Sequence, residues 1–271
     1  LLQDVAGSRI TTDNLDHAKQ VLDTCFAQVW DEQFNNINRA SSNELIPHSI
    51  QERKQVENIR ENLKNLLEFE VSHFIGYQPR FFELRFGREE NVVEYAGAQF
   101  IGSIDRVDAN AHGQALIIDY KHKGAKDLKA YSAKLSLDSE VSKEILPRHV
   151  QSAIYAQIMR KQLTKYELEP VAAIYLGTKE QKDKPSFALA GMATEAATEH
   201  IWNMHPEDKK LRDQAVMVVS QNSAEFADYL DAWENLIAQK VQAMLSGDVR
   251  ANPCDKDACK YCPVKLCDKR R

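Results

Sequence analysis

The sequence predicts an α/β domain followed by a short cysteine-rich tail. Apolar residues recur at helical spacing in several long segments, whereas other segments alternate apolar and polar residues as strands do. Four of the five cysteines lie between Pro253 and Arg271. The chain has 271 residues, of which 43% are hydrophobic, so it can bury a sizeable core. It contains no apolar run long enough to span a membrane.

Two amphipathic helices are expected first. Thr12, Asp13 and Asn14 offer an N-cap, so the first helix should cover about 13–31. A polar loop follows, and a long amphipathic helix then covers about 50–75. The apolar stripe of the first helix contains Ala18, Val21, Leu22, Cys25, Phe26 and Val29, and that of the second contains Ile59, Leu63, Leu66 and Leu67.

Three strands are expected next, and the last two form a hairpin. The segment near 80–87 alternates apolar and polar residues, as a strand with one buried face does. The segments 98–108 and 115–122 are separated by Asn110 and Gly113, which favour a turn. The hairpin therefore places these two strands side by side.

The rest of the chain continues the α/β pattern. After a lysine-rich loop we expect a helix at about 148–163, strands near 171–176 and 186–192, and a helix at about 224–245. The last helix should pack on the sheet through one apolar stripe. That stripe consists of Phe226, Tyr229, Leu230, Trp233, Ile237, Val241 and Met244.

The hairpin carries the strongest candidate for a catalytic site. Its turn brings Asp105 and Asp119 together, and Lys121 shares a face with Asp119 because strand residues two apart project from the same side. Mg²⁺ prefers oxygen ligands, usually one or two carboxylates with several waters, and Mn²⁺ suits the same pair. A bound ion activates water for attack on phosphorus, and a lysine beside it offsets the charge that develops. These residues predict a metal-dependent phosphoryl-transfer site rather than a surface hairpin.

The same residues resemble the PD-(D/E)XK nucleases. Asp105 matches the first motif position, and the run Asp119, Tyr120 and Lys121 matches the (D/E)XK element. Gly-x-Ile-Asp-Arg-Val-Asp before Ile-Asp-Tyr-Lys is similar to the RecB/AddB branch, which comprises nucleases attached to helicases that process broken DNA ends.

A helical motif supports the same branch. Gln151 and Tyr155 are similar to the Gln-x-x-x-Tyr motif of RecB-type nucleases. A spacing of four places both side chains on one helix face. In the family this face lines the DNA path beside the metal, so the resemblance makes both residues candidate active-site contacts.

The resemblance implies a restriction-endonuclease-like core, with a central mixed sheet flanked by helices. It implies a nuclease domain at 1–250 and a metal-cluster tail at 251–271 that packs on the same domain. The implied activity is metal-dependent hydrolysis of DNA, an exonuclease acting on single-stranded ends in bacterial cytoplasm during double-strand-break repair. The chain carries no P-loop, so unwinding must come from a helicase domain or subunit. The start at Leu1 rather than Met favours a fragment of an AddB-like subunit.

Three alternatives remain open at this point. A stand-alone CRISPR-associated exonuclease shares nearly all these motifs. A DNA-binding scaffold could keep the nuclease fold without its chemistry, although intact Asp105, Asp119 and Lys121 argue against this. A zinc-stabilised structural module would depend on the cysteines more than on the carboxylates.

Two further residues are candidates for the site. RecB-type nucleases often carry a histidine on an early helix that points at the metal, and His17 is the candidate here. The alternative is a polar residue on the exposed side of that helix. Glu83, on the first strand, either supports the site or faces solvent.

The C-terminal cysteines predict a second metal centre. Cys254, Cys259, Cys262 and Cys267 are closely spaced, and thiolates bind zinc or iron–sulfur clusters tightly. Disulfides are the weaker interpretation, because no secretory signal is seen and cytosolic thiols stay reduced. The tail resembles that of AddB-type nucleases, in which three such cysteines and one distant cysteine hold a [4Fe–4S] cluster. The fourth ligand is Cys254, Cys25 or a residue outside the chain; Cys25 lies in an apolar stripe, which favours a buried, inert thiol.

The charge distribution is compatible with DNA binding although the formal net charge is −5. Basic residues follow the hairpin and decorate the tail, where they either contact phosphates or are simply solvated. They are Lys121, Lys123, Lys126, Lys129 and Lys134 in the first group, and Lys260, Lys265, Lys269, Arg270 and Arg271 in the second.

Overall fold

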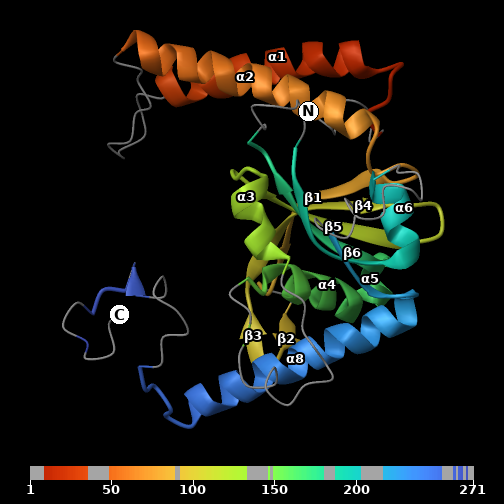
Figure 1. Cartoon of the computed structure of the whole chain (residues 1–271), viewed down its shortest axis with the longest axis vertical. Helices are drawn as coiled ribbons and strands as arrows, with labels where there is room; N and C mark the ends of the chain where they lie inside the picture. The colour runs from red at the N-terminus through yellow and green to blue at the C-terminus, as the bar shows by residue number, and fades with distance from the viewer. Residues whose placement is uncertain are drawn as a thin grey trace.

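The structure is a computed structural model, and it describes most of the chain. The described residues are 9–35, 49–88, 92–132, 146, 149–179, 187–202, 216–251, 259–260, 262–264 and 267. Figure 1 shows a central sheet with a pair of helices at one side and a long helix at the other. Among the helices of these ranges, none combines the length and apolarity that crossing a membrane requires.

The helix pair consists of α1 (Leu15–Asn35) and α2 (Ile50–Val71), close to the predicted ranges. Helix α2 begins with a capping box, in which Ser49 Oγ accepts the Glu52 N–H and the Glu52 carboxylate accepts the Ser49 N–H. The loop predicted between the two helices lies outside the described residues. Helix α2 ends at Val71, four residues before the predicted end at 75, and the chain then turns toward the sheet.

The sheet has six strands in the order β1-β4-β5-β6-β7-β8. Only the pairs β5·β6 and β7·β8 are parallel, so the sheet is mixed. A separate two-stranded sheet joins β2 to β3. The strands are β1 (Gln78–Phe86), β2 (Val93–Tyr95), β3 (Ala98–Phe100), β4 (Gly102–Ala109), β5 (Gln114–Lys121), β6 (Glu169–Gly177), β7 (Leu189–Thr194) and β8 (Val216–Ser220).

Shorter helices and one long helix complete the domain. They are α3 (Ala125–Leu128), the 3₁₀ turn η1 (Lys129–Tyr131), α4 (Gln151–Lys161), α5 (Leu163–Tyr166), α6 (Glu195–Trp202) and α8 (Ser223–Leu245). The sequence did not predict β2, β8 or α6, and it predicted a loop where α3 and η1 lie; all five elements are short. The single strand predicted at 98–108 is two strands, β3 and β4, which belong to different sheets.

The two faces of the sheet pack into separate cores. On β5, Ala115 and Ile117 join the core beneath α4 and α8, whereas Leu116 and Ile118 join the core that contains Leu66 of α2. This alternation fixes the orientation of the residues that follow: Asp119 and Lys121 continue the α4 side, and Tyr120 continues the α2 side.

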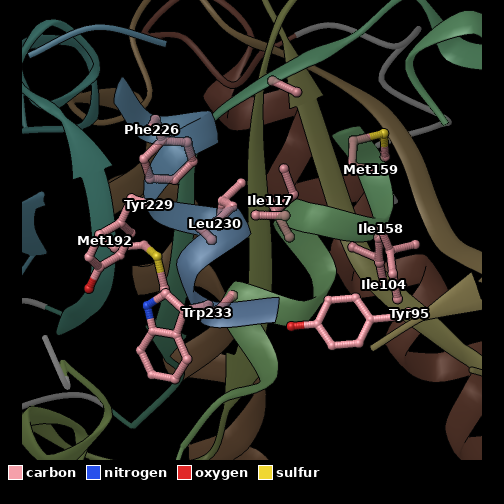
Figure 2. Packing of buried hydrophobic residues seen from close by; sticks show 14 of the residues in the cluster. Tyr95, Ile104, Ile117, Ile158, Met159, Met192, Phe226, Tyr229, Leu230 and Trp233 are labelled. Atoms are coloured by element: carbon pink, nitrogen blue, oxygen red, sulfur yellow. The ribbon is translucent and has the colours of Figure 1, made fainter. Parts of the chain in front are cut away.

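The predicted stripe of the last helix packs on the sheet for most of its length. Figure 2 shows Phe226, Tyr229, Leu230 and Trp233 of α8 in one cluster with Ile117 of β5. Met244 was predicted to pack in the same way, and this is wrong. Its side chain is 57% exposed because it lies in the last turn of α8, beyond the part of the helix that packs on the core.

The side-chain alternation of β1 and β4 is interrupted beside the predicted site. Ile104 and Val107 both pack in the α4-side core, although residues three apart on a regular strand face opposite sides. Phe81 and Leu84 on β1 are also three residues apart, and both pack against the same core. Within this interruption Glu83 adopts a φ of 49°, a backbone conformation that residues other than glycine rarely adopt.

Candidate active site

Asp105 and Asp119 come from adjacent strands where the ladder between them ends. The last backbone pair of β4 and β5 on this side is Arg106 with Ile118. Immediately beyond it, the Tyr120 N–H donates to Asp105 Oδ2 over 2.9 Å. The Asp105 carboxylate therefore takes a backbone hydrogen bond at the point where main-chain pairing stops, and it is held beside the strand that carries Asp119.

Asp119 is a buried carboxylate without a hydrogen bond. It is 2% exposed, and neither of its oxygens has a hydrogen-bond partner among the described residues. Lys121 Nζ lies 2.5 Å from Oδ2, which makes an ion pair by distance although the angles are not those of a hydrogen bond. Burial raises the pKa of Asp119, Lys121 opposes this rise, and the nearby Asp105 adds to it.

This donor set fits a divalent cation. Lys121 offsets the charge of the Asp119 carboxylate, but burying its oxygens without hydrogen bonds is still costly, and a cation bound to them would lower that cost. Asp105 provides a second carboxylate at the same end of the hairpin. Two carboxylates with waters are an ordinary ligand set for Mg²⁺.

Lys121 is tied to helix α4. Its Nζ donates to Gln151 Oε1 over 3.0 Å, and Gln151 Nε2 donates to Tyr155 Oη over 2.7 Å. The same Nζ lies 5.7 Å from the centre of the Tyr175 ring. Gln151 and Tyr155 share one face of α4, as the spacing predicted, so four predicted residues form one continuous chain from Asp119 to Tyr155.

The contact between Lys121 and Gln151 gives a first prediction. Gln151→Ala removes the acceptor that holds the ammonium, and we expect the rate of DNA cleavage to fall about tenfold, the equivalent of one charge-assisted hydrogen bond. Tyr155→Phe removes only the partner of the Gln151 amide, so its effect should be smaller. Gln99→Ala, at an exposed position on β3, is the matched control. An unchanged rate for Gln151→Ala would show that this contact does not assist cleavage.

His17 does not join the aspartates in this structure. Its side chain is exposed on α1, next to Ala18, which packs between the two N-terminal helices. Within the described ranges, no group of three or more histidine, cysteine or acidic side chains is arranged to hold a metal ion. The geometry thus matches the alternative of an exposed polar residue. Glu83 is also exposed, and its carboxylate accepts a hydrogen bond from Ser103 Oγ over 3.1 Å.

The structure shows only part of the cysteine tail. Cys254 lies outside the described residues, as do Lys134, Lys265, Lys269, Arg270 and Arg271. Cys259, Cys262 and Cys267 are half-buried, and the Cys262 N–H donates to the Cys259 carbonyl. Three thiols from one short segment match the donor type of a zinc or iron–sulfur site. Cys25 is half-buried rather than fully buried.

A buried ionic network lies on the opposite face of the hairpin. Arg106 donates to both carboxylate oxygens of Asp108, at 2.6 and 2.7 Å, and to Glu70 of α2 at 2.7 Å. It also donates to Tyr120 Oη at 3.0 Å. Arg106 therefore lies on the opposite side of β4 from the predicted site and pairs with two carboxylates. Sequence reasoning missed Glu70, because its partner is far along the chain.

An aromatic groove of about 300 Å³ lies beside the catalytic candidates, and sequence reasoning missed it as well. It is contiguous with the site because Gln151 and Tyr155 belong to its lining. The remaining lining residues are Phe86, Phe100, Ile101, Gly102, His149, Val150, Ile154 and Tyr175.

The fold and the site together define a class of protein. A mixed sheet flanked by helices, with two aspartates and a lysine on a central hairpin, is the restriction-endonuclease-like arrangement. The sequence matches the PD-(D/E)XK nuclease superfamily over residues 1–267, and the chain belongs to this family. Membership indicates a nuclease that binds DNA, in a family that typically uses Mg²⁺ or Mn²⁺. No curated protein matches the sequence significantly.

Proposed function

We propose that this protein is a divalent-metal-dependent deoxyribonuclease that hydrolyses phosphodiester bonds at Asp105, Asp119 and Lys121. The observation that carries the proposal is the buried Asp119 carboxylate, which lacks a hydrogen bond and has Lys121 2.5 Å away. A protein that used this fold only as a scaffold would gain nothing from burying a carboxylate beside a lysine without satisfying its oxygens by hydrogen bonds. The arrangement therefore favours chemistry over the inactive-scaffold alternative.

Each residue has a distinct task in this reaction. Asp105 and Asp119 would hold Mg²⁺ or Mn²⁺, which when bound supplies Lewis-acid polarisation and a water of lowered pKa. Lys121 places positive charge beside the phosphate, where negative charge develops as the bond to the leaving oxygen breaks. Gln151 holds the ammonium in position, and Tyr155 fixes the Gln151 amide through its hydroxyl oxygen.

We further propose that the protein is a RecB/AddB-type exonuclease acting on single-stranded DNA ends beside a helicase domain or subunit in double-strand-break repair. The Gln151–Tyr155 pair on α4 supports this branch, because it meets the catalytic lysine directly. A stand-alone CRISPR-associated exonuclease is the second candidate, since the same contacts serve it equally.

The test of this function is the release of acid-soluble nucleotides from end-labelled DNA. Single-stranded and double-stranded oligonucleotides are incubated with Mg²⁺, Mn²⁺ or EDTA. We expect release with either metal and none with EDTA, and loss of release in Lys121→Ala. A wild-type protein that binds DNA but releases no nucleotide with any metal would overturn the proposal in favour of the scaffold.

The cysteine tail gives a separate prediction. We expect anaerobically purified protein to be brown, with broad visible absorption, because Cys259, Cys262 and Cys267 ligate a [4Fe–4S] cluster. Serine at any of these three positions should remove the colour. Loss in Cys254→Ser but not in Cys25→Ser would identify the fourth ligand. Colourless protein containing stoichiometric zinc would support the zinc alternative, and protein with neither iron nor zinc would contradict metal ligation altogether.

A further inference from the structure

We propose that the aromatic groove beside Gln151 and Tyr155 binds one unpaired nucleobase of the DNA strand that is being cut. This inference rests on the proposed nuclease function and specifies its substrate: DNA must be single-stranded, or locally opened, at the position that enters the groove. The groove is built from segments far apart in the sequence, namely the end of β1, the β3–β4 junction, the start of α4 and β6.

The lining of the groove suits a flat, uncharged ring. No Asp, Glu, Lys or Arg is among the lining residues. The partly exposed aromatic residues of the lining are Phe100, His149 and Tyr155. The Tyr155 ring packs edge to face against the buried Phe86 ring, with centroids 5.9 Å apart. Tyr175, which also belongs to the lining, is fully buried and packs edge to face with Tyr131 at 4.9 Å between centroids, so it supports the groove rather than offering a free ring face. Bases stack on such surfaces without regard to their identity, because every base has a π-face.

The wall is also held rigidly. A Cβ added at Gly102 would lie only 2.6 Å from the Phe86 ring, so that ring lies directly against the β4 backbone. His149 stacks on Tyr131, with centroids 3.6 Å apart and an interplanar angle of 15°. A preformed aromatic surface loses little conformational entropy when a base binds.

The position of the groove links it to the catalytic residues. Gln151 lines the groove and accepts the hydrogen bond from Lys121, and Tyr175 lies in the wall with Lys121 5.7 Å from its ring centre. One end of the groove is therefore next to the cation that we assign to the phosphate. A nucleotide whose phosphate is at Lys121 can place its base in the apolar groove.

The volume of the groove limits which part of the DNA can enter it. A volume of about 300 Å³ is at the lower end for small-ligand sites, so the groove admits one nucleotide-sized group and not a base pair. A base inside it is separated from any complementary strand. The groove thus favours single strands over intact duplex by its shape.

Ile101 offers a test position that should not disturb folding. It lines the groove, yet its side chain is 64% exposed. Ile101→Ser makes this wall polar, and Phe100→Leu removes an aromatic ring while keeping an apolar side chain. The matched control is Ile59→Ser on α2, where the side chain is 51% exposed and lies outside the groove. Thermal unfolding checks that each variant is folded.

The experiment is a double-mutant cycle in which one change is a protein variant and the other is an abasic nucleotide in the DNA. A single-stranded oligonucleotide carries one abasic nucleotide, moved in steps along the strand, and KM and kcat are measured for each. We expect Ile101→Ser and Phe100→Leu to raise KM for the intact strand about five- to tenfold with little change in kcat. When the abasic nucleotide is the one whose base would enter the groove, the KM of the wild type should rise by the same factor. The KM of the groove variants should rise no further at that position. Ile59→Ser should behave like the wild type throughout.

The outcomes separate this inference from the proposed function. The nucleobase site would be overturned if the variant and the abasic nucleotide raised KM additively at every position. It would also be overturned if the groove variants had the KM of the wild type, a result that fits a groove receiving an apolar side chain of a partner protein. Neither result would contradict the nuclease activity. If the wild type cuts no DNA, the proposed function fails, and the same cycle is run on binding affinity for the oligonucleotides. Absence of coupling in binding would then overturn the groove as well.

Discussion

Asp119→Asn should reduce DNA cleavage by roughly a thousandfold, because a neutral amide oxygen binds a divalent cation much more weakly than a charged carboxylate does. The substitution preserves the size of a side chain that is 2% exposed, so the fold should persist. The rate is measured as nucleotide release from single-stranded DNA under saturating Mg²⁺. Asp228→Asn, at an exposed position on α8, is the control and should keep the wild-type rate.

Metal binding itself can be followed without activity. Mn²⁺ should raise the melting temperature of the wild type and of Asp228→Asn, because an ion that binds only the folded state stabilises it. Mn²⁺ should leave the melting temperature of Asp119→Asn nearly unchanged. A variant that retains both the cleavage rate and the metal-dependent shift would show that Asp119 is not a ligand.

The pH dependence of folding stability in the absence of metal tests whether Asp119 is buried as a titratable carboxyl group. Burial raises the pKa of Asp119, so the folded state binds its proton more tightly than the unfolded state, where the value is near 3.8. The stabilisation from this group is therefore complete below about 3.8 and is lost as pH rises through the higher folded pKa. In EDTA, the stability of the wild type relative to Asp119→Asn should fall over that interval.

Arg106→Met should destabilise the protein by about 3–5 kcal/mol, the usual cost of removing one partner from a buried ion pair. The guanidinium is buried with Asp108 and Glu70, and its loss leaves both carboxylates without their cation. Burial opposes the charge of Arg106, but the two carboxylates outweigh it and hold its pKa well above the ordinary value. The measurement is urea unfolding at neutral pH.

Two variants calibrate this result. Arg53→Met, at an exposed position on α2, should change stability by less than about 0.5 kcal/mol. Tyr120→Phe loses only the hydroxyl that accepts from Arg106 and should cost about 1 kcal/mol. A loss below about 1 kcal/mol for Arg106→Met would mean that the network contributes little to stability.

The parts of the site that could be predicted from sequence are those fixed by local spacing. The turn between β4 and β5 sets the distance between Asp105 and Asp119, and a spacing of four places Gln151 above Tyr155 on α4. The same reasoning predicted the long helices and most strands, because their periodicity extends over many residues. Family membership of the chain agrees with these motifs.

The parts that could not be predicted depend on contacts between distant segments. Phe86, Phe100 and Tyr175 meet in one groove only because three strands and α4 converge there. The interruption at Glu83 breaks the period of two on which strand patterns depend, so no alternation count could place its neighbours. His17 shows the opposite difficulty: its position in a helix was predictable, but the orientation of that helix toward the sheet was not.

The network around Arg106 also has a mechanical consequence. Tyr120 lies between Asp119 and Lys121 in the chain, yet its hydroxyl is bound on the α2 side of the sheet, to the arginine that also holds Glu70. A second tie joins the same elements, since Asn62 of α2 donates to the Thr178 carbonyl, and the Thr178 N–H donates to the Lys121 carbonyl. Helix α2 is thus tied at two points to β5. A displacement of α2 would therefore pull on the strand that carries Asp119 and Lys121 through these two sets of hydrogen bonds.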